Sequence, residues 1–121
     1  MTKKILVIED DNILQKAMKA ALEEAGFEVS QALDGQKGLK AMRTKNPDLV
    51  LLDLIMPKKD GWVVLQEINA DAKISHIPVF VFTAYEKEET ITKCKNLGAK
   101  GFFFKSAYTL EEIVQKVKEN T

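Results

Sequence analysis

The sequence predicts an α/β fold in which helices cover both faces of a doubly wound, five-stranded parallel sheet. Short apolar runs alternate with longer amphipathic ones along the 121-residue chain, and most apolar runs end in a polar or charged residue. Strands that are apolar on both sides are typical of parallel sheets, because helices cover both faces. Alternation of strands and helices, with short right-handed crossovers, favours the doubly wound arrangement.

The predicted strands are the apolar runs. Four are well marked, and a weaker fifth follows Gly26. In chain order, the predicted strands cover residues 5–8, 27–32, 49–52, 79–82 and 102–104.

Amphipathic periodicity predicts a helix after each strand. The first begins near Asp11 and ends before Gly26, and the second follows Asp34 and stops at Asn46, because proline at 47 disfavours a helical residue before it. The third and fourth are expected at 62–70 and 86–97. The fifth opens with Thr109, which stands three residues before a glutamate, the spacing of a capping box.

Composition indicates a water-soluble globular domain, 45% hydrophobic and 30% charged. The 18 basic residues balance the 18 acidic ones, so the surplus of positive charge that is typical of nucleic-acid binders is missing. No apolar run approaches the length of a membrane span, and Cys94 is the single cysteine. We expect one cytoplasmic domain over residues 1–121, which itself binds neither membrane nor nucleic acid.

Polar residues at the strand ends are the candidate functional site. In parallel sheets all strands deliver their carboxyl ends to one edge, where ligands bind. The residues expected there are Glu9, Asp10, Asp11, Asp53, Thr83 and Lys105. Crowded carboxylates repel unless a cation or lysine lies nearby, and one or two carboxylates suit Mg²⁺. Asp10 and Asp53 fit that role, and an aspartate beside a metal can act as nucleophile toward a phosphoryl group.

Four segments resemble response-regulator receiver domains of two-component signalling. They are KKILVIEDD at 3–11, DLVLLDLIMPKKDG at 48–61, VFVFTA at 79–84 and GAKGFFFKS at 98–106. The resemblance implies a flavodoxin-like (βα)5 fold with strand order 2-1-3-4-5. It also implies a phosphoryl group received from a histidine kinase or a histidine phosphotransfer protein, and a signal passed to a downstream protein or an output domain. The domain would then catalyse only its own phosphotransfer and dephosphorylation.

The same resemblance implies a role for each site residue. Mg²⁺ or Mn²⁺ would serve as cofactor, and the signal would leave through the fourth helix, fifth strand and fifth helix. The implied roles are Asp53 as phosphoacceptor and metal ligand, Asp10 as direct metal ligand, Glu9 as ligand through water, the backbone carbonyl of Ile55 as a further ligand, Lys105 as phosphate contact, Thr83 as switch hydroxyl and Phe102 as switch aromatic.

Two residues depart from the family pattern. Phe102 stands where tyrosine is common, and Ser106 stands where proline usually follows the lysine. A cis bond before serine costs about 2.5–4 kcal/mol, so we expect the bond between Lys105 and Ser106 to be trans. These departures keep open an alternative, a receiver-like interaction module that does not depend on phosphate. A flavodoxin-like cofactor binder is disfavoured, because an acidic loop after the first strand repels phosphate.

Neighbouring acidic residues have simpler interpretations. We interpret Asp11 as a helix N-cap rather than a metal ligand. Asp60 and Gly61 are expected to form a turn in which the glycine adopts an unusual φ.

Overall fold

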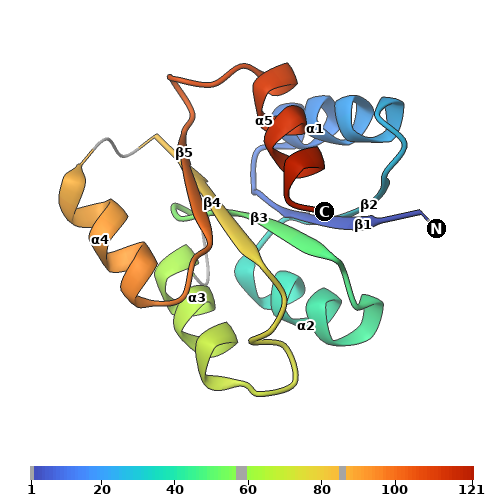
Figure 1. Ribbon diagram of the computed structural model, residues 1–121. Coiled ribbons are helices and arrows are strands. Elements are labelled where there is room, and N and C mark those ends of the chain that lie inside the picture. The colour runs from blue at the N-terminus through green and yellow to red at the C-terminus, as the bar shows by residue number, and fades with distance from the viewer. Residues whose placement is uncertain (1, 57–59, 85–86) are drawn as a thin grey trace.

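A computed structural model describes residues 2–56, 60–84 and 87–121, in which five strands alternate with five helices (Figure 1). The strands are β1 (Lys4–Ile8), β2 (Glu28–Ala32), β3 (Leu49–Asp53), β4 (Val79–Thr83) and β5 (Gly101–Phe104). The helices are α1 (Asn12–Glu24), α2 (Gly35–Lys45), α3 (Gly61–Ala70), α4 (Glu88–Asn96) and α5 (Leu110–Glu119).

The strands form one parallel sheet in the order β2-β1-β3-β4-β5. This order and the predicted fold class are confirmed. The chain reverses its direction of winding between β1 and β3, which are neighbours in the sheet. Their carboxyl ends therefore lie side by side, and the residues that follow them share one edge.

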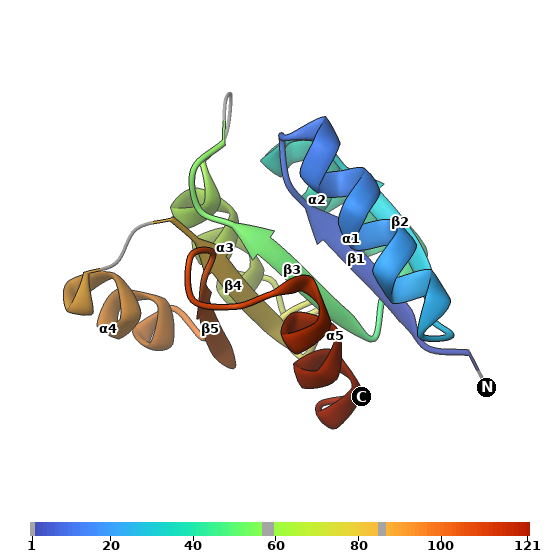
Figure 2. The same cartoon turned by 90° about the horizontal axis from the view of Figure 1, so that it is seen from above.

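Helices cover both faces of the sheet, with α1 and α5 on one face and α2, α3 and α4 on the other (Figures 1 and 2). Alternate strand residues enter two cores. Ile5 and Val7 of β1 pack with α1 and α5, whereas Leu6 and Ile8 pack with the opposite layer. Both faces of β1 and β3 are thus buried, which explains the unbroken apolar runs at residues 5–8 and 49–52.

Several predicted helix ends are confirmed by their capping contacts. The Asp11 side chain accepts hydrogen bonds from the backbone N–H groups of Ile13 (2.9 Å) and Leu14 (3.2 Å), so it is the N-cap of α1. Thr109 forms the predicted capping box of α5. Asn46, in the left-handed conformation at φ 46°, ends α2 before the proline. The predicted start of the fourth helix, Glu86, lies outside the described residues.

The predicted role of Gly61 is wrong. Among the described residues, positive φ occurs at Asn46, Gly26 and Gly98, and Gly61 is instead the first residue of α3, capped by Asp60. Glycine is needed for space: a Cβ at Gly61 would lie 2.4 Å from the carbonyl oxygen of Asp53. The glycine lets the start of α3 approach the end of β3.

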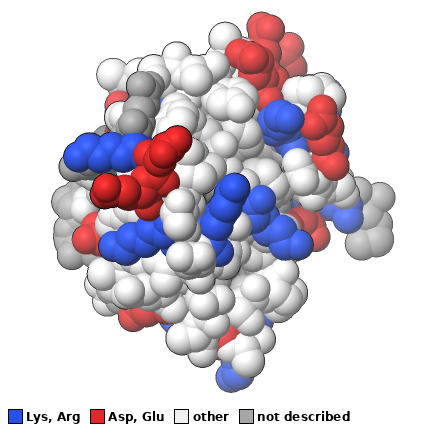
Figure 3. Space-filling model, turned by 60° about the vertical axis from the view of Figure 1, so that its left-hand side comes forward, with Lys and Arg blue, Asp and Glu red and all other residues white. Residues whose placement is uncertain are grey.

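The surface shows no large area of one charge on the face drawn in Figure 3. Lysine and arginine side chains lie interspersed with aspartate and glutamate there. No helix among the described residues combines the length and the apolarity that crossing a membrane requires.

Candidate phosphoacceptor and metal site

Three carboxylates gather at the carboxyl edge of the sheet. Glu9 and Asp10 follow β1, and Asp53 ends β3. One carboxylate oxygen from each lies within 4.8 Å of the others. Glu9 and Asp53 are buried, with exposed fractions of 1% and 3%, whereas Asp10 is exposed. The topology thus brings together the acidic residues that the sequence predicts, with one open side.

Lys105 supplies the positive charge of the site. It follows β5, and its Nζ donates a hydrogen bond to Oε1 of Glu9 at 2.7 Å and lies 3.5 Å from Oδ2 of Asp53. Its backbone N–H donates to the carbonyl of Thr83 at 2.8 Å, which ties the lysine to the end of β4. The peptide bond to Ser106 is trans, as predicted, so the lysine reaches Asp53 without a cis bond.

Burial sets the protonation behaviour of these groups. It raises the pKa of Glu9 to about 7, against the opposing effect of the hydrogen bond from Lys105. Burial also raises the pKa of Asp53, although the positive charge of Lys105 opposes the rise. Burial lowers the pKa of Lys105, but the hydrogen bond to Glu9 and the charge of Asp53 outweigh it and leave that pKa raised. One ammonium therefore does not fully compensate the buried negative charge.

Asp53 is held by its own backbone surroundings. Its Oδ1 accepts a long hydrogen bond from the N–H of Ile55 at 3.4 Å. The N–H of Gly61 donates to the carbonyl of Leu54 at 2.7 Å, which fixes the chain just after Asp53. Ile55 is 51% exposed beside the site. The sequence prediction concerned its carbonyl as a metal ligand, and this role stays a prediction.

The two predicted switch residues lie on the neighbouring strands β4 and β5, with Phe102 opposite Val81, two positions before Thr83. Thr83 ends β4 and is fully buried. Phe102 lies in β5, is partly buried against the core on the α2, α3 and α4 side, and meets Phe104 edge to face at 5.0 Å. Thr83 and Phe104 stand opposite each other in the register of the two strands. An aromatic pair thus lies next to the buried threonine.

Gln15 is a buried polar residue at the site that sequence reasoning missed. It is 1% exposed, and its amide nitrogen donates toward the carbonyl groups around the end of β1. Gln15 precedes Met18 and Leu22, two core residues of α1, at helical spacing. A polar residue in line with a buried stripe was the available signal.

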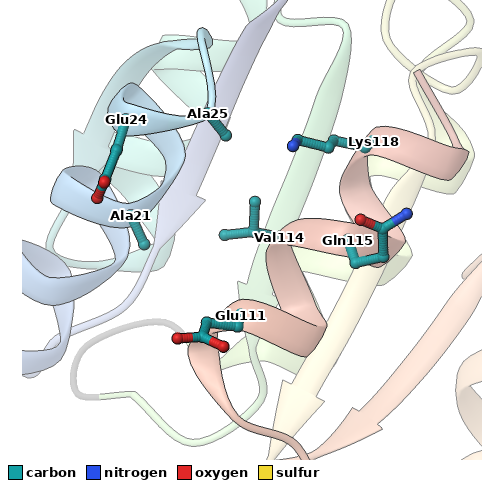
Figure 4. Close-up of a pocket in the computed structure, with 7 residues that line it drawn as sticks. All are labelled: Ala21, Glu24, Ala25, Glu111, Val114, Gln115 and Lys118. Atoms are coloured by element: carbon teal, nitrogen blue, oxygen red, sulfur yellow. The ribbon is translucent and has the colours of Figure 1, made fainter.

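A hollow of about 340 Å³ lies elsewhere, between α1 and α5 (Figure 4). Small and aliphatic side chains, including Ala21 and Val114, line it together with Lys118, which extends from α5 toward α1. It contains none of the site carboxylates. The hollow is therefore separate from the group of carboxylates at the strand ends.

The three carboxylates of Glu9, Asp10 and Asp53 suit a hard divalent cation. Mg²⁺ and Mn²⁺ prefer oxygen ligands, and one or two carboxylates with water commonly complete a Mg²⁺ site. Asp10 offers such an oxygen on the exposed side and Asp53 offers one that is buried, while Glu9 is paired with Lys105. A cation here would offset the negative charge that the single lysine leaves uncompensated.

Comparison with known proteins agrees with this geometry. Residues 5–118 match the family model of the response regulator receiver domain. The DNA-binding dual master transcriptional regulator RpaA of Synechocystis is 35% identical over 115 residues, which cover 95% of this chain and 47% of RpaA. The chain spans about half the length of the curated relatives it matches.

Two solved structures are also similar. The phosphorylated cyanobacterial phytochrome response regulator RcpA is 34% identical with a TM-score of 0.83, over 98% of this chain and 91% of RcpA. The Mn²⁺-bound form of response regulator Rcp1 is 29% identical with a TM-score of 0.84, over 97% of this chain and 92% of Rcp1. The chain belongs to the response regulator receiver domain family, the signalling modules of two-component systems.

Proposed function

We propose that residues 1–121 form one receiver domain that accepts a phosphoryl group on Asp53 with Mg²⁺ or Mn²⁺ beside it. The observation that carries this proposal is the setting of Asp53. Its buried carboxylate lies within reach of the oxygens of Glu9 and Asp10, and 3.5 Å from the ammonium of Lys105. A nucleophile, a candidate metal site and a fixed cation thus converge at one place.

Phosphotransfer follows from these groups. An Asp53 oxygen forms a bond to phosphorus while the bond from phosphorus to the donor nitrogen breaks, and that electron pair leaves with the imidazole of a phosphohistidine. Lys105 then neutralises a phosphoryl oxygen, which is most of what this step requires. The divalent cation supplies further positive charge when bound. In dephosphorylation, water attacks phosphorus and returns the Asp53 carboxylate with inorganic phosphate.

Asp10 and Asp53 would bind the cation directly, Glu9 through water and Ile55 through its backbone carbonyl. The exposure of Asp10 supports direct binding, while the contact between Glu9 and Lys105 favours an indirect role for Glu9. The relatives support the chemistry by analogy, since Rcp1 is described with Mn²⁺ bound and RcpA as phosphorylated.

Output would run through Thr83 and Phe102 to the face formed by α4, β5 and α5. A phosphoryl group on Asp53 can attract the Thr83 hydroxyl, and the ring of Phe102 can then turn inward, a local charge event that changes packing. On binding of a phosphoryl mimic, we expect chemical-shift changes at Phe102 and at Lys95 of α4. Shifts that spare both residues would refute this route.

The partners follow from the family and the relatives. A histidine kinase or a histidine phosphotransfer protein would supply the phosphoryl group in the cytoplasm. The receiver would act on a downstream protein or on an output domain, as the greater length of RpaA suggests, and any DNA contact would belong to that domain.

The test measures the mass of the intact protein before and after incubation with a phosphodonor. A small phosphodonor with Mg²⁺ should add one phosphoryl group to the wild type and to Asp48→Asn, a matched control just before β3 that contacts the backbone of Lys4. Asp53→Asn and excess chelator should each abolish the gain. Modification that persists in Asp53→Asn would show that the site is assigned wrongly. A wild type that accepts no phosphoryl group, even from a phosphotransfer protein, would favour the phosphate-independent module.

A further inference from the structure

The side-chain amide of Gln15 donates to three backbone carbonyls, which lie in β1, directly after β1 and in β2. Its Nε2 lies 2.9 Å from the oxygen of Val7, 3.1 Å from that of Glu9 and 2.9 Å from that of Ala32. A primary amide has two N–H hydrogens, so one of them is shared between acceptors. The side chain thereby joins the end of β1 to the end of β2 from the start of α1.

These carbonyls surround the peptide that leads into the metal site. The Glu9 carbonyl belongs to the peptide bond between Glu9 and Asp10, and the N–H of Glu9 donates to the same Ala32 oxygen at 3.0 Å. Gln15 therefore holds the backbone on both sides of Glu9. The direction in which Asp10 leaves the strand depends on the orientation of this peptide.

The side-chain oxygen of Gln15 indicates that this residue does more than fill space. The Oε1 of Gln15 is buried and accepts no hydrogen bond from the described residues. An unpaired buried carbonyl is unfavourable, and a methionine of similar length would fill the space without one. Methionine, however, cannot donate hydrogen bonds to the three carbonyls as the Gln15 amide does.

We propose that Gln15 is a positioning residue of the metal site, which orients the peptide between Glu9 and Asp10 so that the carboxylates bind a divalent cation. The inference rests on the proposed function. It assigns no contact between Gln15 and the cation.

Metal affinity of the purified chain tests it. Gln15→Met keeps the length and removes both donors, and Gln15→Asn keeps the amide but shortens its reach. Calorimetric titration with Mg²⁺ and Mn²⁺ should show dissociation constants raised roughly tenfold in both variants, the size typical of lost support for a ligand. Met18→Ala is the matched control, since Met18 is equally buried in α1 and donates no hydrogen bond to these carbonyls. It should bind within twofold of the wild type despite lower stability.

A metal-free readout accompanies the titration. Hydrogen exchange of the Glu9 backbone amide should be faster in Gln15→Met than in Met18→Ala when the two are compared under conditions that give them the same free energy of unfolding. Gln15 variants that bind like the wild type, or a Met18→Ala that loses as much affinity, would overturn the inference alone. A wild type that binds neither cation would overturn the proposed function and the inference with it.

Discussion

Replacing Gly61 with alanine should destabilise this protein, although alanine is the better helix former. Gly61 is the first residue of α3 and is buried against the end of β3. A Cβ there would lie 2.4 Å from the carbonyl oxygen of Asp53 and 2.4 Å from the Cα of Leu54. Both are backbone atoms, which cannot rotate away as a flexible side chain would. The start of α3 and the end of β3 must therefore separate.

The two opposing effects set the magnitude. Alanine gains at most about 1 kcal/mol in helix propensity over glycine. Overpacking in a dense core typically costs about 1–3 kcal/mol, and contact with two backbone atoms places this change at the upper end. The net loss in the free energy of unfolding is about 2 kcal/mol. At about 4 °C per kcal/mol for a chain of this size, Tm should fall by about 8 °C.

The displacement should also affect function, because the backbone of Asp53 itself must move. Thermal unfolding and the rate of phosphorylation from a small phosphodonor are the two assays. Gly26→Ala is the control: its Cβ meets nothing within 4 Å, but φ is 97°, so strain should cost about 1 kcal/mol without slowing phosphorylation. A Gly61→Ala variant as stable as the wild type would refute the packing argument.

Two further predictions separate the charged residues of the site. Asp10→Ala should weaken Mg²⁺ binding roughly tenfold or more. Asp11→Ala should keep the Mg²⁺ affinity of the wild type but lose about 1 kcal/mol of stability, because Asp11 is the N-cap of α1. Calorimetric titration and thermal unfolding compare the two variants, and equal losses of Mg²⁺ affinity would contradict these roles. Lys105→Met should bind Mg²⁺ more tightly, because the variant lacks the competing ammonium 3.5 Å from Asp53. It should nevertheless accept a phosphoryl group more slowly. Without metal it should be about 1–3 kcal/mol less stable, since Glu9 loses its partner. Weaker Mg²⁺ binding in Lys105→Met would contradict this account.

Most elements of the fold were predictable from sequence because their signals are local. Buried parallel strands require apolar residues on both faces, and β1 and β3 have them at residues 5–8 and 49–52. Helix ends depend on side chains next to the backbone they cap, as at Asp11 and Thr109. Once the strands are parallel, their polar ends must meet at one edge, so the meeting of Asp10, Asp53 and Lys105 could be expected.

Contacts between distant segments were not predictable in the same way. Gly61 looked like a turn glycine because aspartate before glycine is a local turn signal, but its actual constraint comes from the end of β3 across the loop. Gln15 looked like one more polar residue of an amphipathic helix. Its role depends on the backbone carbonyls of Glu9, Val7 and Ala32, which lie six, eight and 17 positions from it in the chain, the last of them on another strand.

The sequence by itself determined the order of elements, the alternation that makes the sheet parallel, and the kinds of charged group delivered to its edge. The tertiary structure alone decided which carboxylates are buried, that Lys105 donates to Glu9 while lying 3.5 Å from Asp53, and that Gln15 holds the peptide before Asp10. The physical reason is the separation in sequence over which each kind of interaction acts. Burial periodicity and capping act within a few residues, whereas the charge balance and the hydrogen bonds of the site join groups up to 96 positions apart in the chain.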